Sequence, residues 1–181
     1  MTEQRRRLVE RITDPAYVDA LDALDVDALK AKRDECREAE IELSFERRLC
    51  QARIEILRAE LERRERGEEA DDLVARLPEI LAGGTSRGDA PLPDRAPDFT
   101  IPRNADNPRR RVDEVVGDQT LARLPHLGRD EIKRIGENLE EWERSVSARR
   151  KEVQTILDRL QDEIVRRYKS GEADPGAVLG G

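Results

Sequence analysis

The sequence predicts an all-α protein, built as a long antiparallel two-helix coiled-coil hairpin with a short N-terminal helix and a flexible interhelical linker. Only 36% of the 181 residues are hydrophobic and 3% are aromatic, whereas 41% are charged, so a thick globular core is not expected. Apolar residues instead recur at helical spacing within two stretches of similar length. A hairpin of two such helices needs only a thin apolar seam between them.

The first element expected is a short helix within residues 1–26. Asp14 and the proline that follows it are a typical N-cap and first-turn pair, and they would open a helix that extends through about residue 24. Tyr17, Val18 and Leu21 would share one side of this helix. Because so short a helix is not stable alone, it must pack either on the hairpin core or against a partner protein.

Two long helices are expected to carry most of the remaining chain. Asp25 or Asp27 can cap a helix over residues 27–66, which neither Gly nor Pro interrupts. A second helix of similar length is expected over residues 129–170. Complementary seams would pair the two helices antiparallel, in a register where paired residue numbers add to about 197.

The connecting residues have a different composition. Gly, Pro, Asp and Asn are concentrated between the two long helices, so we expect residues 67–128 to be a largely flexible linker. A modest apolar segment directly before residue 129 is the exception within it. We expect the tail, residues 171–181, to be disordered.

The two long helices carry the same polar pattern, shifted by 103 positions. Its 4-3-4-4 spacing places five side chains along one narrow face of each helix. The first copy is Glu40, Ser44, Arg47, Gln51 and Glu55, and the second is Glu143, Ser147, Arg150, Gln154 and Asp158. The apolar residues between them repeat at the same shift. We interpret the two copies as an internal duplication whose polar part is functional.

The expected register brings like charges together. Arg47 and Arg150 would approach one another near the middle of the hairpin. The motif carboxylates would gather toward the two ends, Glu40 with Asp158 and Glu55 with Glu143. An unpaired buried charge costs about 3 to 5 kcal/mol, so an empty seam of this kind is unfavourable. A ligand with central anionic groups and outlying hydrogen-bond donors would relieve both conflicts, and guanine nucleotides have this pattern.

The doubled pattern E-x3-S-x2-R-x3-Q-x3-[DE] resembles that of the actinobacterial anti-sigma factors of the RsiG type. The second copy matches the family pattern fully, whereas Glu55 stands in the first copy where the family has Asp. The resemblance implies that the ten motif residues bind cyclic di-GMP, held as a dimer. It also implies that the bound form captures a flagellar-type, WhiG-like sigma factor, so that sporulation genes stay silent.

Charge and hydropathy exclude several other classes. The net charge of −7, with both signs interspersed, argues against DNA binding and suits a partner with a basic surface. No apolar run reaches the length of a membrane helix, and no secretion signal is recognisable, so we expect a cytoplasmic protein that does not bind membranes. The sequence offers no nucleophile with a base, no phosphate loop and no metal-ligand cluster, so we expect neither catalysis nor a metal site.

Several residues leave two interpretations open. The duplicated stripe could instead belong to a structural coiled-coil adaptor with no nucleotide ligand, in which the arginines set the register. Trp142 and Phe45 could stack on a base or pack against neighbouring chain. His126 is expected to be a loop or capping residue, and the arginine run 109–111 a solvated linker cluster. Cys36 and Cys50 are 14 residues apart on one helix, too far for a disulfide, and are expected to be small seam residues.

Overall fold

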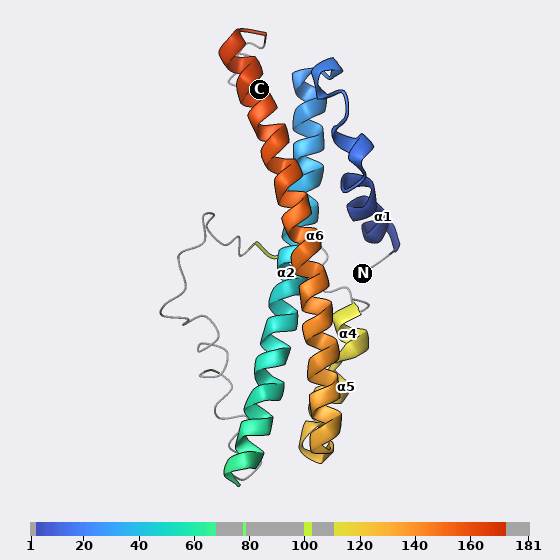
Figure 1. The fold of residues 1–181 in the computed structure, drawn as a ribbon, viewed down its shortest axis with the longest axis vertical. Coiled ribbons are helices and arrows are strands. Elements are labelled where there is room, and N and C mark those ends of the chain that lie inside the picture. Colours follow the sequence, from blue (N-terminus) through green and yellow to red (C-terminus); the bar gives the residue numbers. More distant parts are fainter. Residues whose placement is uncertain (1–2, 68–77, 79–99, 103–110, 173–181) are drawn as a thin grey trace. The chain divides into compact units, whose positions relative to one another are not determined.

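The computed structural model describes residues 3–67, 78, 100–102 and 111–172, and every regular element within these ranges is helical (Figure 1). Two of the elements, α2 and α6, are 41 and 42 residues long. The α-helices are α1 (Glu3–Ile12), α2 (Val26–Arg66), α4 (Arg111–Val115), α5 (Asp118–Ala122) and α6 (Arg129–Ser170), and the 3-10 helices are η1 (Pro15–Val18), η2 (Leu21–Ala23) and η3 (Leu124–His126). The all-α class and the two long helices predicted from the sequence are therefore confirmed.

The N-terminal region differs from the single short helix expected. An α-helix, α1, precedes Asp14, and the residues after it form the separate 3-10 helices η1 and η2. The predicted cap itself is confirmed, because the Asp14 carboxylate accepts a hydrogen bond from the backbone N–H of Ala16 at 2.9 Å. Ala20, between η1 and η2, has a φ of 54°, a left-handed conformation that a right-handed helix cannot contain. This residue explains why no continuous helix forms here.

The bounds of the long helices agree closely with the expectation. Of the two candidate caps, Asp25 caps α2: its carboxylate accepts from the backbone N–H of Ala28 at 2.7 Å. The helix ends where Gly67 adopts a φ of +71°, a conformation that suits glycine. Helix α6 ends in the same way, with Gly171 at a φ of +77°.

The apolar segment before residue 129, the exception within the expected flexible linker, is helical in the structure over residues 111–128. These residues form α4, α5 and η3, and they bury Val112, Val116, Leu124 and Leu127 in an apolar core. The apolar residues in this segment supply enough burial to order it. Apart from these residues and a few isolated positions, the expected flexible linker and nearly all of the expected disordered tail lie outside the described residues.

The chain divides into two compact units. Unit 1 comprises Ser44–Ser147, and unit 2 comprises Thr2–Leu43 together with Ala148–Gly181. Each unit therefore contains a part of α2, a part of α6 and one preceding helical segment: α4, α5 and η3 in unit 1, and α1, η1 and η2 in unit 2.

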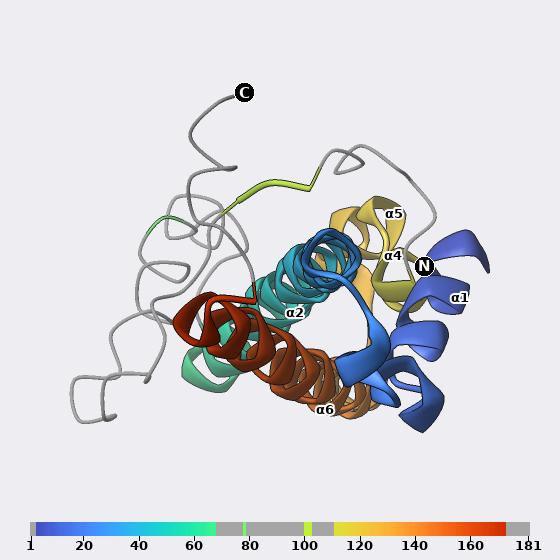
Figure 2. The same ribbon diagram turned by 90° about the horizontal axis from the view of Figure 1, so that it is seen from above.

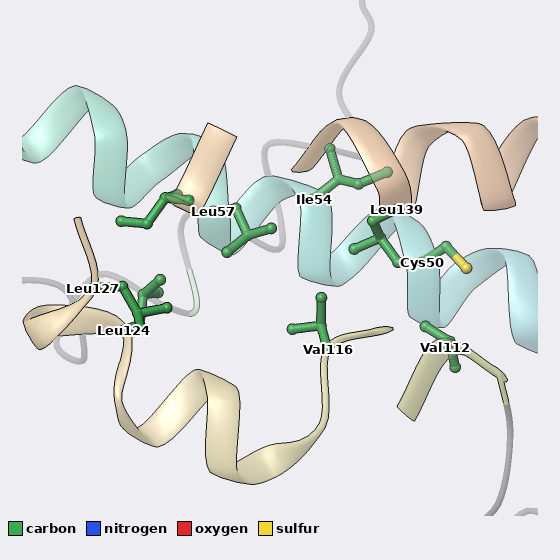
Figure 3. Close-up of a cluster of buried hydrophobic side chains, with 9 residues drawn as sticks. Cys50, Ile54, Leu57, Val112, Val116, Leu124, Leu127 and Leu139 are labelled. Carbon is green, nitrogen blue, oxygen red and sulfur yellow. The ribbon is translucent and has the colours of Figure 1, made fainter. Parts of the chain in front are cut away.

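Unit 1 is held by an apolar core between α2, α6 and the residues that precede α6 (Figure 3). Its buried members are Cys50, Ile54, Leu57, Val112, Val116, Leu124, Leu127, Ile132 and Leu139. Polar pairs follow the same interface: Glu65 with Arg129, Arg58 with Glu140, and Gln51 with Glu143. Residue numbers fall on α6 as they rise on α2, so the two segments of this unit run in opposite directions.

In unit 2 the N-terminal residues pack on the first part of α2, where Figure 2 shows them in blue. Tyr17 is buried, and its hydroxyl contacts the Glu35 carboxylate at 3.0 Å and the Lys32 carbonyl oxygen at 3.2 Å. Val18 is buried beside it. The structure thus assigns these two side chains to the core of the unit. Cys36 is also buried here as a free thiol, as Cys50 is in unit 1, which agrees with the expected seam role.

Candidate functional site

The motif residues are divided between the two long helices and between the two units. Helix α2 carries the first copy and α6 carries the second. Unit 1 contains Ser44, Arg47, Gln51, Glu55, Glu143 and Ser147, whereas unit 2 contains Glu40, Arg150, Gln154 and Asp158. Within each unit, residues of one copy contact residues of the other.

In unit 2 the contacts converge on Glu40. Its carboxylate accepts a hydrogen bond from Arg150 Nε at 3.1 Å and another from Gln154 Nε2 at 3.0 Å. Glu40 is buried, with 8% of its surface exposed, so water does little to screen this ion pair. Three motif residues thus form one hydrogen-bonded group that joins α2 to α6.

In unit 1 the contacts converge on Glu143. Gln51 Nε2 donates to its carboxylate at 3.2 Å, and the Ser147 hydroxyl donates to the same oxygen at 2.9 Å. The Arg47 guanidinium completes an ion pair with that oxygen at 3.7 Å. The arrangement repeats the one in unit 2, because Glu143, Arg47 and Gln51 are the duplicates of Glu40, Arg150 and Gln154.

The charge pairing in the motif differs from the pairing that the sequence predicted. The sequence predicted like charges gathered at each level, but Glu40 and Glu143 each contact a guanidinium from the opposite helix. In the expected register each of these carboxylates lies seven residues, about 10 Å or two turns along the axis, from the level of its arginine. The arginine and glutamate side chains are both long enough to extend toward one another and close that distance. The predicted approach of Arg47 to Arg150 would be a contact between the two units, so it stays a prediction.

A second carboxylate in unit 1 was missed by the sequence analysis. Glu46 is 4% exposed and accepts a hydrogen bond from Trp142 Nε1 at 2.9 Å. Both Glu46 and Glu143 act on Cys50: burial first, and then these two negative charges, raise the pKa of its thiol to about 12. The contact favours the packing role for Trp142 over base stacking. Because position 46 lies outside the repeated stripe, its charge gave no signal in the sequence.

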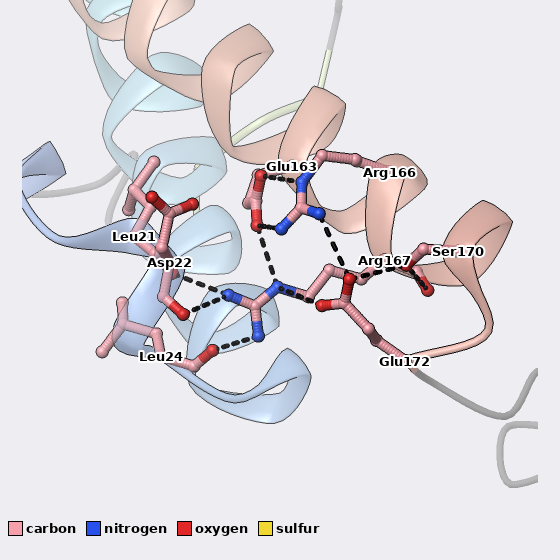
Figure 4. Close-up of polar contacts among 8 residues, drawn as sticks. All are labelled: Leu21, Asp22, Leu24, Glu163, Arg166, Arg167, Ser170 and Glu172. Atoms are coloured by element: carbon pink, nitrogen blue, oxygen red, sulfur yellow. Dashed lines mark hydrogen bonds and ion pairs between the residues drawn. The ribbon is translucent and has the colours of Figure 1, made fainter.

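An arginine near the C-terminal end of α6 forms hydrogen bonds with the turn that precedes α2 (Figure 4). Arg167 is buried, and its guanidinium donates to the carbonyl oxygens of Leu21, Asp22 and Leu24. Its Nε donates to Glu163 at 2.8 Å. Arg166 and Arg167 together hold the pKa of Glu163 at about 2, since hydrogen bonds from both stabilise the charged carboxylate.

Unit 1 contains the same arrangement, shifted by 103 residues. Arg64 donates to the carbonyl oxygens of Leu124, Pro125 and Leu127, and its Nε donates to Glu60 at 2.6 Å. We call these two groups the arginine clasps. They show that the duplication includes the turn before each long helix. Applying the known shift to residues 21–25 would have revealed this in the sequence.

The remaining candidates contribute little to a site in the described residues. Phe45 lies near the Arg48 guanidinium, with 6.0 Å between the guanidinium carbon and the ring centroid. His126 ends η3 and is exposed, as expected of a turn residue. The side chains of the arginine run 109–111 lie outside the part of the chain that the structure describes.

The fold and the motif define a class of protein: a helical, internally duplicated chain whose repeated polar groups join two long helices. The model of the family described as RsiG-like matches residues 15–81 of this chain. This match supports the resemblance seen in the motif over that part of the chain. The matched range includes all of α2 and the first motif copy.

The matched range covers less than half of the chain, and the second motif copy lies outside it. The comparison with curated proteins gave no match. Among the helices that the structure describes, none combines the length and the apolar character needed to cross a membrane.

Proposed function

We propose that this protein is an anti-sigma factor that binds cyclic di-GMP through its duplicated motif and sequesters a flagellar-type, WhiG-like sigma factor, which represses sporulation transcription. The two long helices form one antiparallel coiled-coil hairpin in this proposal, with the ligand on the motif face. The observation that carries it is the repetition of one contact group. Glu40 pairs with Arg150 and Gln154 in unit 2, and its duplicate Glu143 pairs with Arg47 and Gln51 in unit 1. The arginine contact is a hydrogen bond from Nε in unit 2 and a longer ion pair through Nη1 in unit 1.

The side-chain types suit this ligand. A guanidinium can pair in bidentate fashion with phosphate oxygens or with O6 and N7 of guanine. The carboxylates of Glu40 and Glu143 can accept from the opposite guanine edge, where N1–H and the exocyclic amine are donors. Serine and glutamine add neutral contacts without further charge. A motif present twice fits a ligand made of two equivalent dinucleotides.

Ligand binding in this proposal is an exchange of partners. Arg47 and Arg150 are both paired with glutamates. Phosphate must therefore displace a carboxylate from each guanidinium, and guanine then supplies donors to the displaced carboxylate. Because this exchange offsets part of the binding free energy, additional contacts from the sigma factor would raise the ligand affinity. Linkage requires that the ligand raises the sigma-factor affinity by the same factor.

Calorimetric titration with cyclic di-GMP tests the proposal. We expect the wild-type chain to bind, and Arg47→Ala and Arg150→Ala each to reduce the affinity by a factor of about 100 or more, since each loses a charge-assisted bidentate contact. Arg66→Ala on α2 and Arg159→Ala on α6 are matched controls, because both arginines are exposed and lie outside the motif. Binding that survives both motif substitutions would remove the proposed site.

A structural adaptor is the alternative, and one observation favours it. The motif residues already satisfy one another across the helices, as register-setting ion pairs in a coiled coil would. An adaptor would show no heat of binding with cyclic di-GMP. Its Arg150→Ala variant would lose stability and nothing else, so the same titration separates the two functions.

A further inference from the structure

Unit 1 contains a hollow of about 220 Å³ between α2 and α6. Its floor is apolar and comes from both helices: Ile54, Leu57 and Leu61 from α2, and Ile132 from α6. Three of these four side chains are buried members of the unit 1 core. The hollow is thus an open continuation of that core.

A glycine opens the hollow. Gly136 lies within α6 and lines the hollow, and a Cβ added there would meet no atom within 4 Å. Glycine within a helix costs about 1 kcal/mol relative to alanine, so this position carries a cost in stability without any steric need for glycine. Its duplicate in unit 2 is Arg33, whose guanidinium contacts Asp34 at 2.9 Å. The two halves of the duplication therefore differ at this point.

The hollow lies on the motif face of unit 1. Gly136, Glu140 and Glu143 follow a 4-3 spacing along α6, which places them in one line on that helix. Arg58 continues the α2 stripe in the same way, three residues after Glu55. The hollow is therefore in line with the motif and extends beyond the end that Glu55 and Glu143 mark.

The rim of the hollow is electrically balanced. Arg58 and Glu140 pair across it at 2.7 Å. Lys133 and Glu137, which also line it, are four residues apart on α6 and carry opposite charges. A charged group that entered the hollow would lose its contacts with water and would find no unpaired opposite charge on the rim to replace them. The rim and the floor together fit an uncharged, apolar side chain.

We propose that this hollow receives a bulky apolar side chain of the sigma-factor partner, next to the proposed nucleotide-binding motif. The inference rests on the proposed function, because it assumes a protein that binds the motif face together with the ligand. It also makes the two copies of the duplicated surface different for a partner. The partner finds an apolar hollow beside Gly136, whereas the duplicate of that position carries Arg33.

Variants that fill the hollow test this inference without damaging the fold. Gly136→Leu adds an apolar side chain, and Gly136→Arg adds the residue of the duplicate position. Gly136→Ala is the matched control, because it gains the same helix propensity and leaves the hollow largely open. We expect all three to unfold at or above the wild-type temperature. In the presence of cyclic di-GMP, Gly136→Leu and Gly136→Arg should weaken binding to a flagellar-type sigma factor by about tenfold or more, and Gly136→Ala should not.

The nucleotide titration is repeated on each variant. Unchanged nucleotide affinity with reduced sigma-factor affinity supports the inference. Three other results would overturn the inference. Reduced nucleotide affinity would assign the hollow to the ligand, and a changed oligomeric mass would assign it to a second copy of the chain. Unchanged sigma-factor affinity would show that the sigma factor does not occupy the hollow. A wild-type chain that binds neither nucleotide nor sigma factor overturns the proposed function as well, and this is seen before any variant is compared.

Discussion

Arg64 and Arg167 are duplicates of one another, and each binds three backbone carbonyl oxygens that are themselves duplicates. Arg64 contacts Leu124, Pro125 and Leu127, and Arg167 contacts Leu21, Asp22 and Leu24. A guanidinium is suited to this task because its donors lie in one plane and point at several acceptors at once. The clasps therefore define the repeated structural unit as a turn followed by a long helix.

Removal of a clasp should destabilise the protein. Arg167→Ala leaves the carbonyl oxygens of the η2 turn without their donors and removes one of the two arginines that contact Glu163. We expect a loss of about 3 kcal/mol in the free energy of unfolding, and a similar loss for Arg64→Ala. Urea denaturation measures both, with Arg159→Ala as the exposed control on α6. A loss no larger than that of the control would contradict the role of the clasps.

The clasp carboxylates should make stability depend on pH in the acid range. The pKa of Glu163 is held at about 2, below its ordinary 4.5, and the pKa of Glu60 is also lowered, mainly by its hydrogen bonds with Arg63. Because the folded-state pKa lies below the unfolded one, the stabilisation is complete above about pH 4.5 and is lost as the pH falls toward 2.

Urea midpoints measured between pH 6 and pH 2.5 test this dependence. The wild-type midpoint should fall across that range, and Glu163→Gln should flatten part of the fall. Glu152→Gln, which changes an exposed glutamate of the same helix, should retain the wild-type profile. Parallel profiles for all three chains would show that Glu163 is not a source of the acid sensitivity.

Arg150→Lys separates ligand binding from stability. Lysine keeps the positive charge near Glu40 but loses the planar fork that pairs with phosphate or guanine in bidentate fashion. We expect the unfolding temperature to change little and the cyclic di-GMP affinity to fall about tenfold or more. Arg159→Lys should change neither quantity. Full ligand affinity in the Arg150→Lys chain would show that only the charge is needed.

Both thiols should be inert in the folded chain. Burial raises the pKa of Cys36 and, together with Glu46 and Glu143, raises the pKa of Cys50 to about 12. The reactive thiolate is thus almost absent at pH 8, and neither sulfur is accessible. A thiol reagent such as Ellman's should label the chain only when denaturant is added, and then at both cysteines. With Cys36→Ser, labelling of the native chain at Cys50 would disagree with the burial seen here.

The sequence predicted the long helices well because a 3.6-residue pattern without Gly or Pro leaves few alternatives. Val26–Arg66 and Arg129–Ser170 agree with the expected ranges to within a residue. The sequence marked the residues before α6 only as an apolar exception within a flexible linker, and it did not predict their helices. Their order comes from tertiary burial of Val112, Val116 and Leu124, which a local pattern does not display.

The positions of the repeated motif could be read from the sequence, but the contacts among its side chains could not. A shift of 103 residues identified all ten motif positions, and the structure brings residues of both copies together in each unit. The pairing of Glu40 with Arg150 was not foreseen because helical spacing gives the position of a Cα atom. The end of a long side chain can lie a full turn away from it. Glu46 was missed for another reason: its burial depends on Trp142, which is distant in sequence.

The glutamates that pair with the motif arginines also bear on the base selectivity that the proposed function implies. A nucleotide that takes Arg47 and Arg150 leaves the carboxylates of Glu143 and Glu40 in search of donors. Guanine offers two adjacent donors on one edge, whereas adenine presents an acceptor at N1 and would place it against a negative charge. In the proposed complex, an adenine dinucleotide with the same phosphates would leave both carboxylates without donors, so we expect the chain to bind it more weakly than cyclic di-GMP.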